Sequence, residues 1–170
     1  RSDKIIVSSK KVRDELILID QNTATKITVL PFGIPFDMDN DKIKIKNKYF
    51  LFVGMDHPIK NIQFIKEVFR KLKKSREFKS YKLILVTKNC SRKKLRLLYR
   101  NATALLTGSY YESFNFPVLE ALSQGCPVIG LKPAVIPELK RYVNLANNLD
   151  EFIENMKKPS IKPDIKSIGQ

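Results

Sequence analysis

The chain has 170 residues, with 32 Lys and Arg against 17 Asp and Glu, and its formal net charge is +15. A hydrophobic content of 43%, with 6 Gly and 9 Pro, excludes disordered and fibrous proteins. The length predicts one domain with a core that needs no disulfide or metal staple. No apolar run is long enough to span a bilayer or serve as a signal peptide, and the two cysteines make no disulfide framework. We therefore expect a cytoplasmic protein, and a fragment, since it opens at Arg1 without Met.

The positive charge is concentrated in the middle of the chain. Residues 41–100 carry 19 basic and 4 acidic side chains, whereas residues 1–40 carry 6 of each and residues 101–170 carry 7 of each. Such a surplus is typical of solvated lysine-rich helix faces, of surfaces that meet anionic lipid, or of nucleic-acid-binding modules.

Strand and helix signals alternate along the chain. Ser9 and Ser91 are candidate N-caps, and Val12, Leu16 and Ile19 are apolar at a helical spacing. The expected strands cover residues 4–8, 27–30, 49–54, 81–87, 102–107 and 127–131. The expected helices cover residues 10–19, 61–74, 91–100 and 117–124, and residues 35–48 are expected to form a connecting loop.

Strands that are continuously apolar and alternate with helices predict a parallel sheet covered on both faces. The expected fold is therefore a doubly wound, Rossmann-like α/β domain over residues 1–158, followed by a C-terminal tail over 159–170. In such sheets ligands bind beyond the carboxyl ends of the strands, and the loops after Val53, Val86, Leu106 and Ile129 are the places to search.

The first candidate site follows the strand that ends at Gly54, which permits a tight turn. Lys60 precedes a helix N-terminus, where its ammonium and free backbone N–H groups can meet one anion, such as a phosphate. From position alone, Lys60 is equally well explained as one of many solvated lysines.

The second candidate is a pair of carboxylates, Glu112 and Glu120, separated by seven residues. Glu112 lies in a loop and Glu120 in the first turn of the next helix, and both can accept hydrogen bonds from hydroxyl-rich ligands. Between them, the segment Phe114-Asn115-Phe116 leads into a helix N-terminus that can hold phosphate or sugar oxygens through its backbone N–H groups. Alone, the pattern fits a solvated Glu112 and a Glu120 that interacts with the helix dipole at least as well.

Metal and thiol chemistry find less support. The acidic loop with Asp37, Asp39 and Asp41 lacks the glycine and the final glutamate of a calcium loop, and we interpret it as solvated. His57 is the only histidine, which excludes a Cys/His zinc cluster. Cys126 is expected to pack at the start of a strand rather than act as a nucleophile.

Together these pieces resemble glycosyltransferase family 4 (glycosyl transferases group 1), specifically the C-terminal, donor-binding domain of its GT-B enzymes. The block from Glu112 to Gly130 is similar to the family's E-x7-E loop with the helix and strand that follow. Further similar segments stand in the family's order: residues 26–34, 52–54 with 60–61, 98–102 and 136–138.

The resemblance implies a retaining, metal-independent transfer of a sugar from a UDP- or GDP-linked donor, with no other cofactor. It implies that Lys60 contacts the diphosphate, that Glu120 binds the ribose hydroxyls and that Glu112, the expected catalytic residue, lies near the transferred sugar. Gly54 and the backbone of Phe114, Asn115 and Phe116 complete the donor site. The implied partners are a nucleotide-sugar, a glycan or lipid-linked acceptor and an anionic membrane surface on the cytoplasmic side, but no nucleic acid.

The chain departs from the family pattern in three places. Met55 stands where a basic residue or threonine is usual, and Asn115 stands where the E-x7-E loop usually has glycine, although Asn tolerates positive φ. Between Thr87 and Ser91 a helix and strand that normally border the nucleobase are missing, which leaves the base open. The family's N-terminal acceptor domain is not in this chain. Two alternative functions are a basic nucleic-acid- or nucleotide-binding module and a GT-B-type sugar-nucleotide epimerase.

Overall fold

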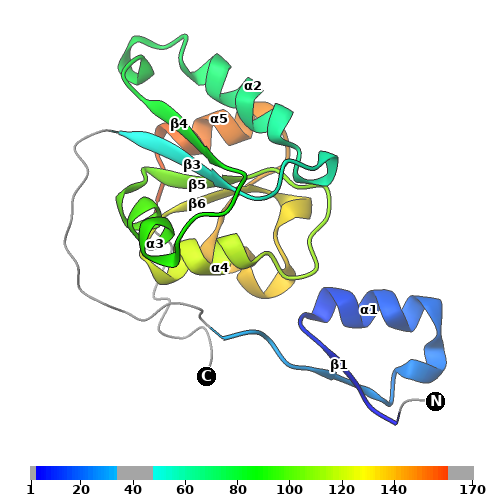
Figure 1. Cartoon of the computed structure of the whole chain (residues 1–170). Coiled ribbons are helices and arrows are strands. Elements are labelled where there is room, and N and C mark those ends of the chain that lie inside the picture. Colours follow the sequence, from blue (N-terminus) through cyan, green and yellow to red (C-terminus); the bar gives the residue numbers. More distant parts are fainter. Residues whose placement is uncertain (1–2, 34–47, 161–170) are drawn as a thin grey trace.

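A computed structural model describes residues 3–33 and 48–160. Within this part, five parallel strands form the main sheet in the order β4-β3-β5-β6-β7. These strands are β3 (Tyr49–Val53), β4 (Lys82–Val86), β5 (Ala104–Thr107), β6 (Val128–Leu131) and β7 (Asn144–Ala146). The predicted doubly wound α/β fold is confirmed, and the carboxyl ends of all five strands meet at one edge of the sheet (Figure 1).

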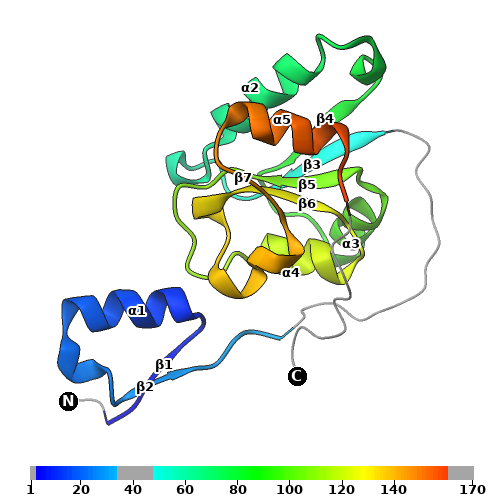
Figure 2. The same cartoon turned by 180° about the vertical axis from the view of Figure 1, so that it is seen from behind.

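Helices cover both faces of this sheet (Figures 1 and 2). The helices are α2 (Ile62–Leu72), α3 (Arg92–Asn101), α4 (Phe116–Ser123) and α5 (Leu149–Lys157). One hydrophobic core lies between the sheet and α2 with α5, and a second lies between the sheet and α3 with α4. The central strands β3 and β5 are buried on both sides, which explains their uninterrupted apolar sequences. None of the helices in the described ranges is long and apolar enough to cross a bilayer.

The first two strands do not join the main sheet. β1 (Ile5–Val7) and β2 (Ile27–Val29) pair in parallel with each other, and α1 (Lys10–Ile19) connects them. This β-α-β segment lies beside the end of the main sheet where α4 begins (Figures 1 and 2). The predicted domain over residues 1–158 thus contains two sheets, and its extent stays a prediction.

Local expectations are confirmed at the caps and corrected elsewhere. Ser9 and Ser91 each accept a hydrogen bond from the backbone N–H group three residues on, as predicted for N-caps. Ile19, however, is 82% exposed, so the predicted apolar face of α1 is not a core face at that position. After residue 131 the sequence pattern predicts no element, whereas the structure has β7 and α5. Residues 35–47 of the predicted loop 35–48, with Asp37, Asp39 and Asp41, and most of the tail lie outside the described residues.

Candidate functional site

The carboxyl end of β3 turns at Gly54, which lies against the stem of Lys60. The Gly54 N–H donates to the Val86 carbonyl at 3.1 Å, and a Cβ on Gly54 would lie 3.3 Å from the Phe52 ring and 3.7 Å from Lys60 Cδ. After this turn a short 3-10 helix, η2 (Pro58–Lys60), begins where His57 Nδ1 accepts the Ile59 N–H. A side chain at position 54 would therefore press on the Phe52 ring, whereas its contact with the Lys60 stem would be an ordinary van der Waals contact.

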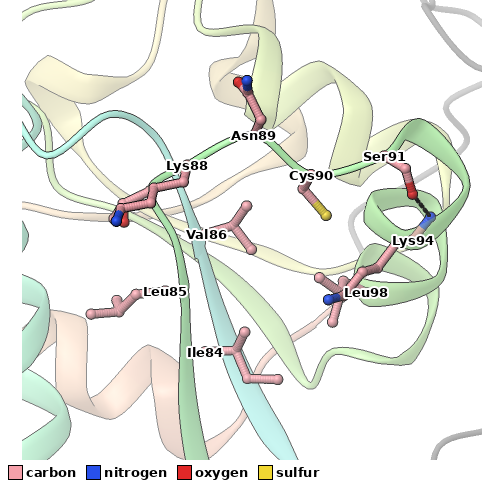
Figure 3. A pocket seen from close by; sticks show the side chains of 10 residues that line it. Ile84, Leu85, Val86, Lys88, Asn89, Cys90, Ser91, Lys94 and Leu98 are labelled. Atoms are coloured by element: carbon pink, nitrogen blue, oxygen red, sulfur yellow. Dashed lines mark hydrogen bonds between the residues drawn. The ribbon is translucent and has the colours of Figure 1, made fainter.

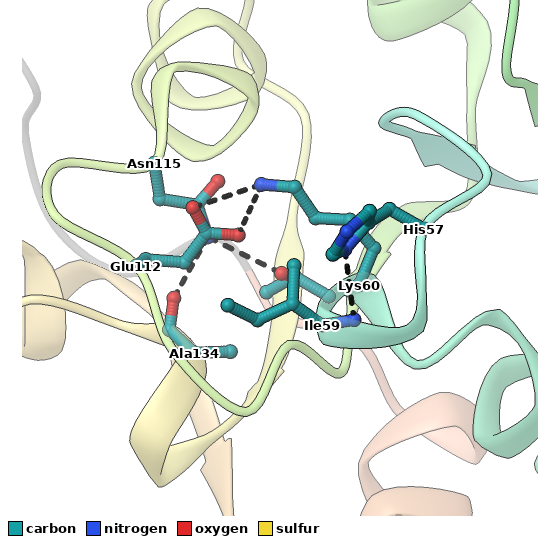
Figure 4. A network of polar contacts seen from close by, with 7 residues as sticks. His57, Ile59, Lys60, Glu112, Asn115 and Ala134 are labelled. Atoms are coloured by element: carbon teal, nitrogen blue, oxygen red, sulfur yellow. Dashed lines mark hydrogen bonds and ion pairs between the residues drawn. The ribbon is translucent and has the colours of Figure 1, made fainter.

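Lys60 and Glu112, predicted separately, form an ion pair (Figure 4). Lys60 Nζ donates to both Glu112 oxygens, at 2.8 Å to Oε1 and 3.0 Å to Oε2. The Lys60 side chain is 20% exposed and that of Glu112 only 9%. Two further hydrogen bonds join the same loops, from the Tyr110 N–H to the Ile59 carbonyl and from Asn61 Nδ2 to the Gly108 carbonyl. The pair is therefore held by its backbone surroundings as well as by its charges.

Asn115 adopts the left-handed conformation that the family's glycine would adopt, with φ 67°. Its side chain does not cap α4; Nδ2 donates instead to Thr107 Oγ1 at 3.2 Å and to the Ala134 carbonyl at 2.7 Å. Asn115 is 5% exposed, and these bonds satisfy its buried amide. The side chain thus fixes the entry into α4, and it leaves the first-turn N–H groups of the helix without a side-chain cap.

Phe114 and Phe116 flank Asn115 and pack with Phe32 at the end of the N-terminal segment. The Phe32 ring centroid lies 5.0 Å from that of Phe114 and 4.7 Å from that of Phe116. Phe114 is buried, whereas Phe32 and Phe116 are 49% and 42% exposed. The three rings contact one another in a single cluster, with the Phe114 and Phe116 centroids 5.2 Å apart. The contribution predicted for Phe114 and Phe116 uses their backbone N–H groups, so it does not conflict with this packing of their side chains.

The N-terminal segment also holds the loop at positions that sequence reasoning did not find. Ser9, fully buried, donates from Oγ to the Ser113 carbonyl at 2.6 Å. The Lys10 N–H donates to Glu138 Oε1 at 2.6 Å, and Tyr111 OH donates to Glu15 Oε2 at 2.6 Å. The neighbours of Glu112 on both sides are therefore tied to α1. Only the predicted N-cap at Ser9 gave any signal for this contact.

Glu120 lies in the second turn of α4, not in the first as predicted, because the helix begins at Phe116, and it contacts α3 rather than the ion pair. Tyr99 OH donates to Glu120 Oε2 at 2.8 Å. Burial raises the pKa of the Glu120 carboxyl, and the hydrogen bond from Tyr99 and the charge of Arg92 oppose that rise. The structure therefore brings Lys60 and Glu112 into contact, whereas Glu120 has its own partner. Tyr99 is a polar contact that the sequence did not reveal.

A pocket of about 610 Å³ opens between the end of β4 and the start of α3 (Figure 3). It is lined by the strand residues 84–86, by the short connection 87–91 and by Lys94 and Leu98 of α3. This is where the sequence lacks the family's additional helix and strand. Burial and then Glu120 raise the pKa of Tyr99, and Leu98, which precedes Tyr99 in α3, lines the pocket. The pocket is thus close to the Tyr99–Glu120 contact.

No cluster of three His, Cys, Asp or Glu side chains suited to a metal occurs in residues 3–33 and 48–160. Cys126 is 2% exposed, and burial raises the pKa of its thiol to about 12. The thiol is therefore protonated at neutral pH and packs in the core. The candidate ligand-holding features at the strand ends are the ion pair, the start of α4, Glu120 and the pocket near it.

Known proteins resemble this chain in sequence and in fold. Residues 83–141 match the profile of the family Glycosyl transferases group 1. A probable sucrose-phosphate synthase of Thermosipho melanesiensis is 26% identical over 174 residues, which cover 83% of this chain and 41% of that protein. The chain thus spans about two fifths of the length of that curated relative.

Solved structures share the fold. A UDP-forming α,α-trehalose-phosphate synthase from Burkholderia xenovorans has a TM-score of 0.73 at 11% identity, over 92% of this chain and 53% of that one. WaaG, a glycosyltransferase involved in lipopolysaccharide biosynthesis, has a TM-score of 0.67 at 18% identity, over 91% and 53%. The pneumococcal O-GlcNAc transferase GtfA, in complex with UDP and GlcNAc, has a TM-score of 0.63 at 17% identity, over 91% and 37%.

The predicted resemblance to glycosyl transferases group 1 is thus confirmed over residues 83–141, and the chain shares the fold of these glycosyltransferases over about nine tenths of its length.

Proposed function

We propose that this chain is the donor-binding part of a retaining glycosyltransferase that transfers a sugar from a UDP- or GDP-linked donor without a metal ion. The observation that carries the proposal is the ion pair between Lys60 and Glu112, beside the start of α4. An ammonium group has three N–H donors, and the pair uses two of them on one carboxylate. The third is free to meet a phosphate oxygen while Glu112 keeps the side chain in place.

The other contacts of the donor follow from the strand ends. In the first turn of α4, Pro117 has no N–H and the Val118 N–H donates to the Asn115 carbonyl, so the backbone N–H groups suited to diphosphate and sugar oxygens are those of Phe114, Asn115 and Phe116. Glu120 suits the two hydroxyls of a ribose, since a carboxylate accepts from two neighbouring OH groups. The pocket at the end of β4 has room for a nucleobase next to that ribose. In this proposal the subsites hold, in order, the diphosphate, the ribose and the base of the donor.

The chemistry needs charge stabilisation more than proton abstraction. The bond between the anomeric carbon and the diphosphate oxygen breaks, and its electron pair leaves with the diphosphate. The acceptor oxygen bonds to the anomeric carbon on the same face, and its proton passes to the departing phosphate oxygen. Lys60 and the N-terminus of α4 stabilise the negative charge that develops, which is the part a metal would otherwise play. Glu112, held by Lys60, is placed to contact the sugar.

The acceptor in this proposal is a glycan or a lipid-linked glycan at the cytoplasmic face of a membrane. The similarity to WaaG, involved in lipopolysaccharide biosynthesis, supports this class. The basic surplus of residues 41–100 supports contact with anionic lipid. The acceptor site itself lies in a part of the enzyme beyond this chain, so we expect the chain alone to bind nucleotide weakly and to transfer no sugar.

Calorimetric titration of the chain with UDP and with GDP tests the proposal. Lys60→Ala should weaken binding about tenfold or more, because a charge-assisted hydrogen bond is lost. Lys66→Ala is the matched control, since it removes the same charge from an exposed position of α2. Equal affinity of both variants for the nucleotides would contradict the site. Binding of a short DNA duplex alone, with a steep salt dependence, would instead favour a nucleic-acid-binding module.

A further inference from the structure

Tyr99 and Glu120 form a hydrogen bond between two helices on the same face of the sheet. Tyr99 lies in α3, Glu120 in the second turn of α4, and Tyr99 OH donates to Glu120 Oε2 at 2.8 Å. Tyr99 is fully buried and belongs to the core between these helices and the sheet. A buried phenol in a packed core holds one rotamer, so its hydroxyl is a fixed point for the carboxylate.

The contact engages only one of the two Glu120 oxygens. Among residues 3–33 and 48–160, no hydrogen bond to Glu120 Oε1 is found, and that atom is not among the buried unpaired ones. A carboxylate on a free side chain samples several rotamers and loses that freedom when a ligand binds. When Oε2 is already held by a hydrogen bond, the side chain has lost much of this freedom before the ligand arrives. Binding through Oε1 then costs less entropy.

We propose that Tyr99 is the positioning residue of the ribose-binding carboxylate: its hydroxyl fixes Glu120 through Oε2 and keeps Oε1 directed to the donor's hydroxyl groups. This inference rests on the proposed function, because it assigns Tyr99 a part in the same donor site. It concerns the nucleoside portion of the ligand and not the transferred sugar.

The electrostatic surroundings of Glu120 favour this role. Burial raises the pKa of Glu120, while the hydrogen bond from Tyr99 and the charge of Arg92, both on α3, lower it. Around the Tyr99 hydroxyl, the other titratable groups are Cys90 and Cys126, and burial together with Glu120 raises the pKa of Tyr99, so the phenol stays a donor. Loss of the Tyr99 hydroxyl should therefore raise the pKa of Glu120 further and protonate it at a higher pH.

The chain offers a matched control in Tyr49. Tyr49 is 1% exposed, lies in the same core, and donates its OH to the Leu98 carbonyl at 2.7 Å. Burial raises the pKa of Tyr49 to about 12, so this phenol is also neutral at ordinary pH. Tyr49→Phe removes the same atom from the same core and leaves Glu120 with its partner. Both variants should lose similar stability.

The test measures UDP and GDP affinity as a function of pH for the wild-type chain, Tyr99→Phe and Tyr49→Phe. Tyr99→Phe should weaken binding about three- to tenfold near neutral pH, the effect of one lost hydrogen bond to a charged group. As the pH is lowered, the affinity of Tyr99→Phe for nucleotide should also begin to fall at a higher pH than that of the wild type. Tyr49→Phe should match the wild type in affinity and in pH profile.

A titration of the free protein separates this inference from the proposed function. The carboxyl carbon resonance of Glu120 should titrate at a higher pH in Tyr99→Phe than in the wild type or in Tyr49→Phe. If the resonance shifts but no variant, nor the wild type, binds UDP or GDP, the proposed function fails and the contact remains structural. If nucleotides bind but Tyr99→Phe behaves like Tyr49→Phe in affinity and pH profile, the positioning role is overturned.

Discussion

The ion pair between Lys60 and Glu112 predicts that two substitutions in direct contact change nucleotide affinity in opposite directions. Glu112→Gln keeps the size of the side chain and one oxygen that accepts from Lys60, but it removes the negative charge. Lys60 then presents an uncompensated ammonium to an anion, whereas Lys60→Ala removes the cation. We therefore expect Glu112→Gln to bind UDP or GDP more tightly than the wild type, and Lys60→Ala to bind them more weakly.

The magnitude follows from the geometry of the pair. The Glu112 oxygens lie 2.8 and 3.0 Å from Lys60 Nζ. A phosphate oxygen on the opposite side of Nζ lies about two hydrogen-bond lengths, or about 6 Å, from the carboxylate. With an effective dielectric constant of about 20, which applies near a protein surface, their repulsion is about 2.8 kcal/mol, or about a hundredfold in Kd.

Calorimetric titration with UDP and GDP measures this gain, and urea unfolding measures what it costs. Because both side chains are mostly buried, at 20% and 9% exposure, Glu112→Gln leaves a cation without its counterion. We expect a stability loss of about 2 kcal/mol, somewhat below that for breaking a fully buried pair. A variant that is less stable but binds nucleotide more tightly would support the reasoning. Nucleotide binding no tighter than in the wild type would refute it, since Glu112 would then not offset the charge of Lys60.

Three further predictions concern stability and the surface. Gly130→Ala should lower the free energy of unfolding by about 1–3 kcal/mol in urea unfolding, because the new Cβ would lie 2.8 Å from Val135 Cγ2 and 2.9 Å from Thr107 Cγ2. Gly33→Ala is the control: among the described residues no atom lies within 4 Å of a Cβ at that position, so the stability should change little. Burial raises the pKa of the Glu120 carboxyl above its ordinary value of 4.5, so ionisation of this group lowers the stability of the fold as the pH rises through that pKa. Glu120→Gln should therefore be more stable than the wild type near neutral pH, and the difference in stability should shrink in acid. A variant less stable than the wild type at neutral pH would contradict this. The chain should co-sediment with liposomes in proportion to their anionic lipid content and less at high salt, and indifference to that content would rule out membrane docking.

Much of the fold follows from the sequence because the strands of the main sheet are locally unambiguous. β3 and β5 are continuously apolar, and the capping serines and the amphipathic pattern of α2 mark helix boundaries to within about two residues. β7 was missed because Asn144–Ala146 is a short segment that begins with Asn, and only its pairing beside β6 makes it a strand. The placement of β1 and β2 in a second sheet is a matter of tertiary pairing, on which local pattern carries no information.

The site was predictable as positions but not as contacts. Lys60 and Glu112 were both found at strand ends, yet their contact depends on β3 lying next to β5 although β4 comes between them in the chain. That order cannot be read from spacing. Tyr99 shows the same limit, since in sequence it is only a helical residue after an apolar pair. Its hydroxyl can be recognised as the partner of Glu120 only when α3 and α4 are seen side by side on the sheet.

The ion pair also separates the charge surplus from the chemistry of the site. Lys60 and Glu112 together contribute no net charge, so a nucleotide approaching the site is attracted by the other basic residues of the segment 41–100, which has 19 basic against 4 acidic side chains. That attraction acts over about one Debye length, roughly 8–10 Å at physiological salt, and governs association rather than the final contact. Added salt should therefore slow the association of UDP or GDP, whereas Lys60→Ala should mainly speed its dissociation. The two effects should be separable in a stopped-flow experiment, and a variant whose association alone is slowed would show that Lys60 is only one more member of the basic surface.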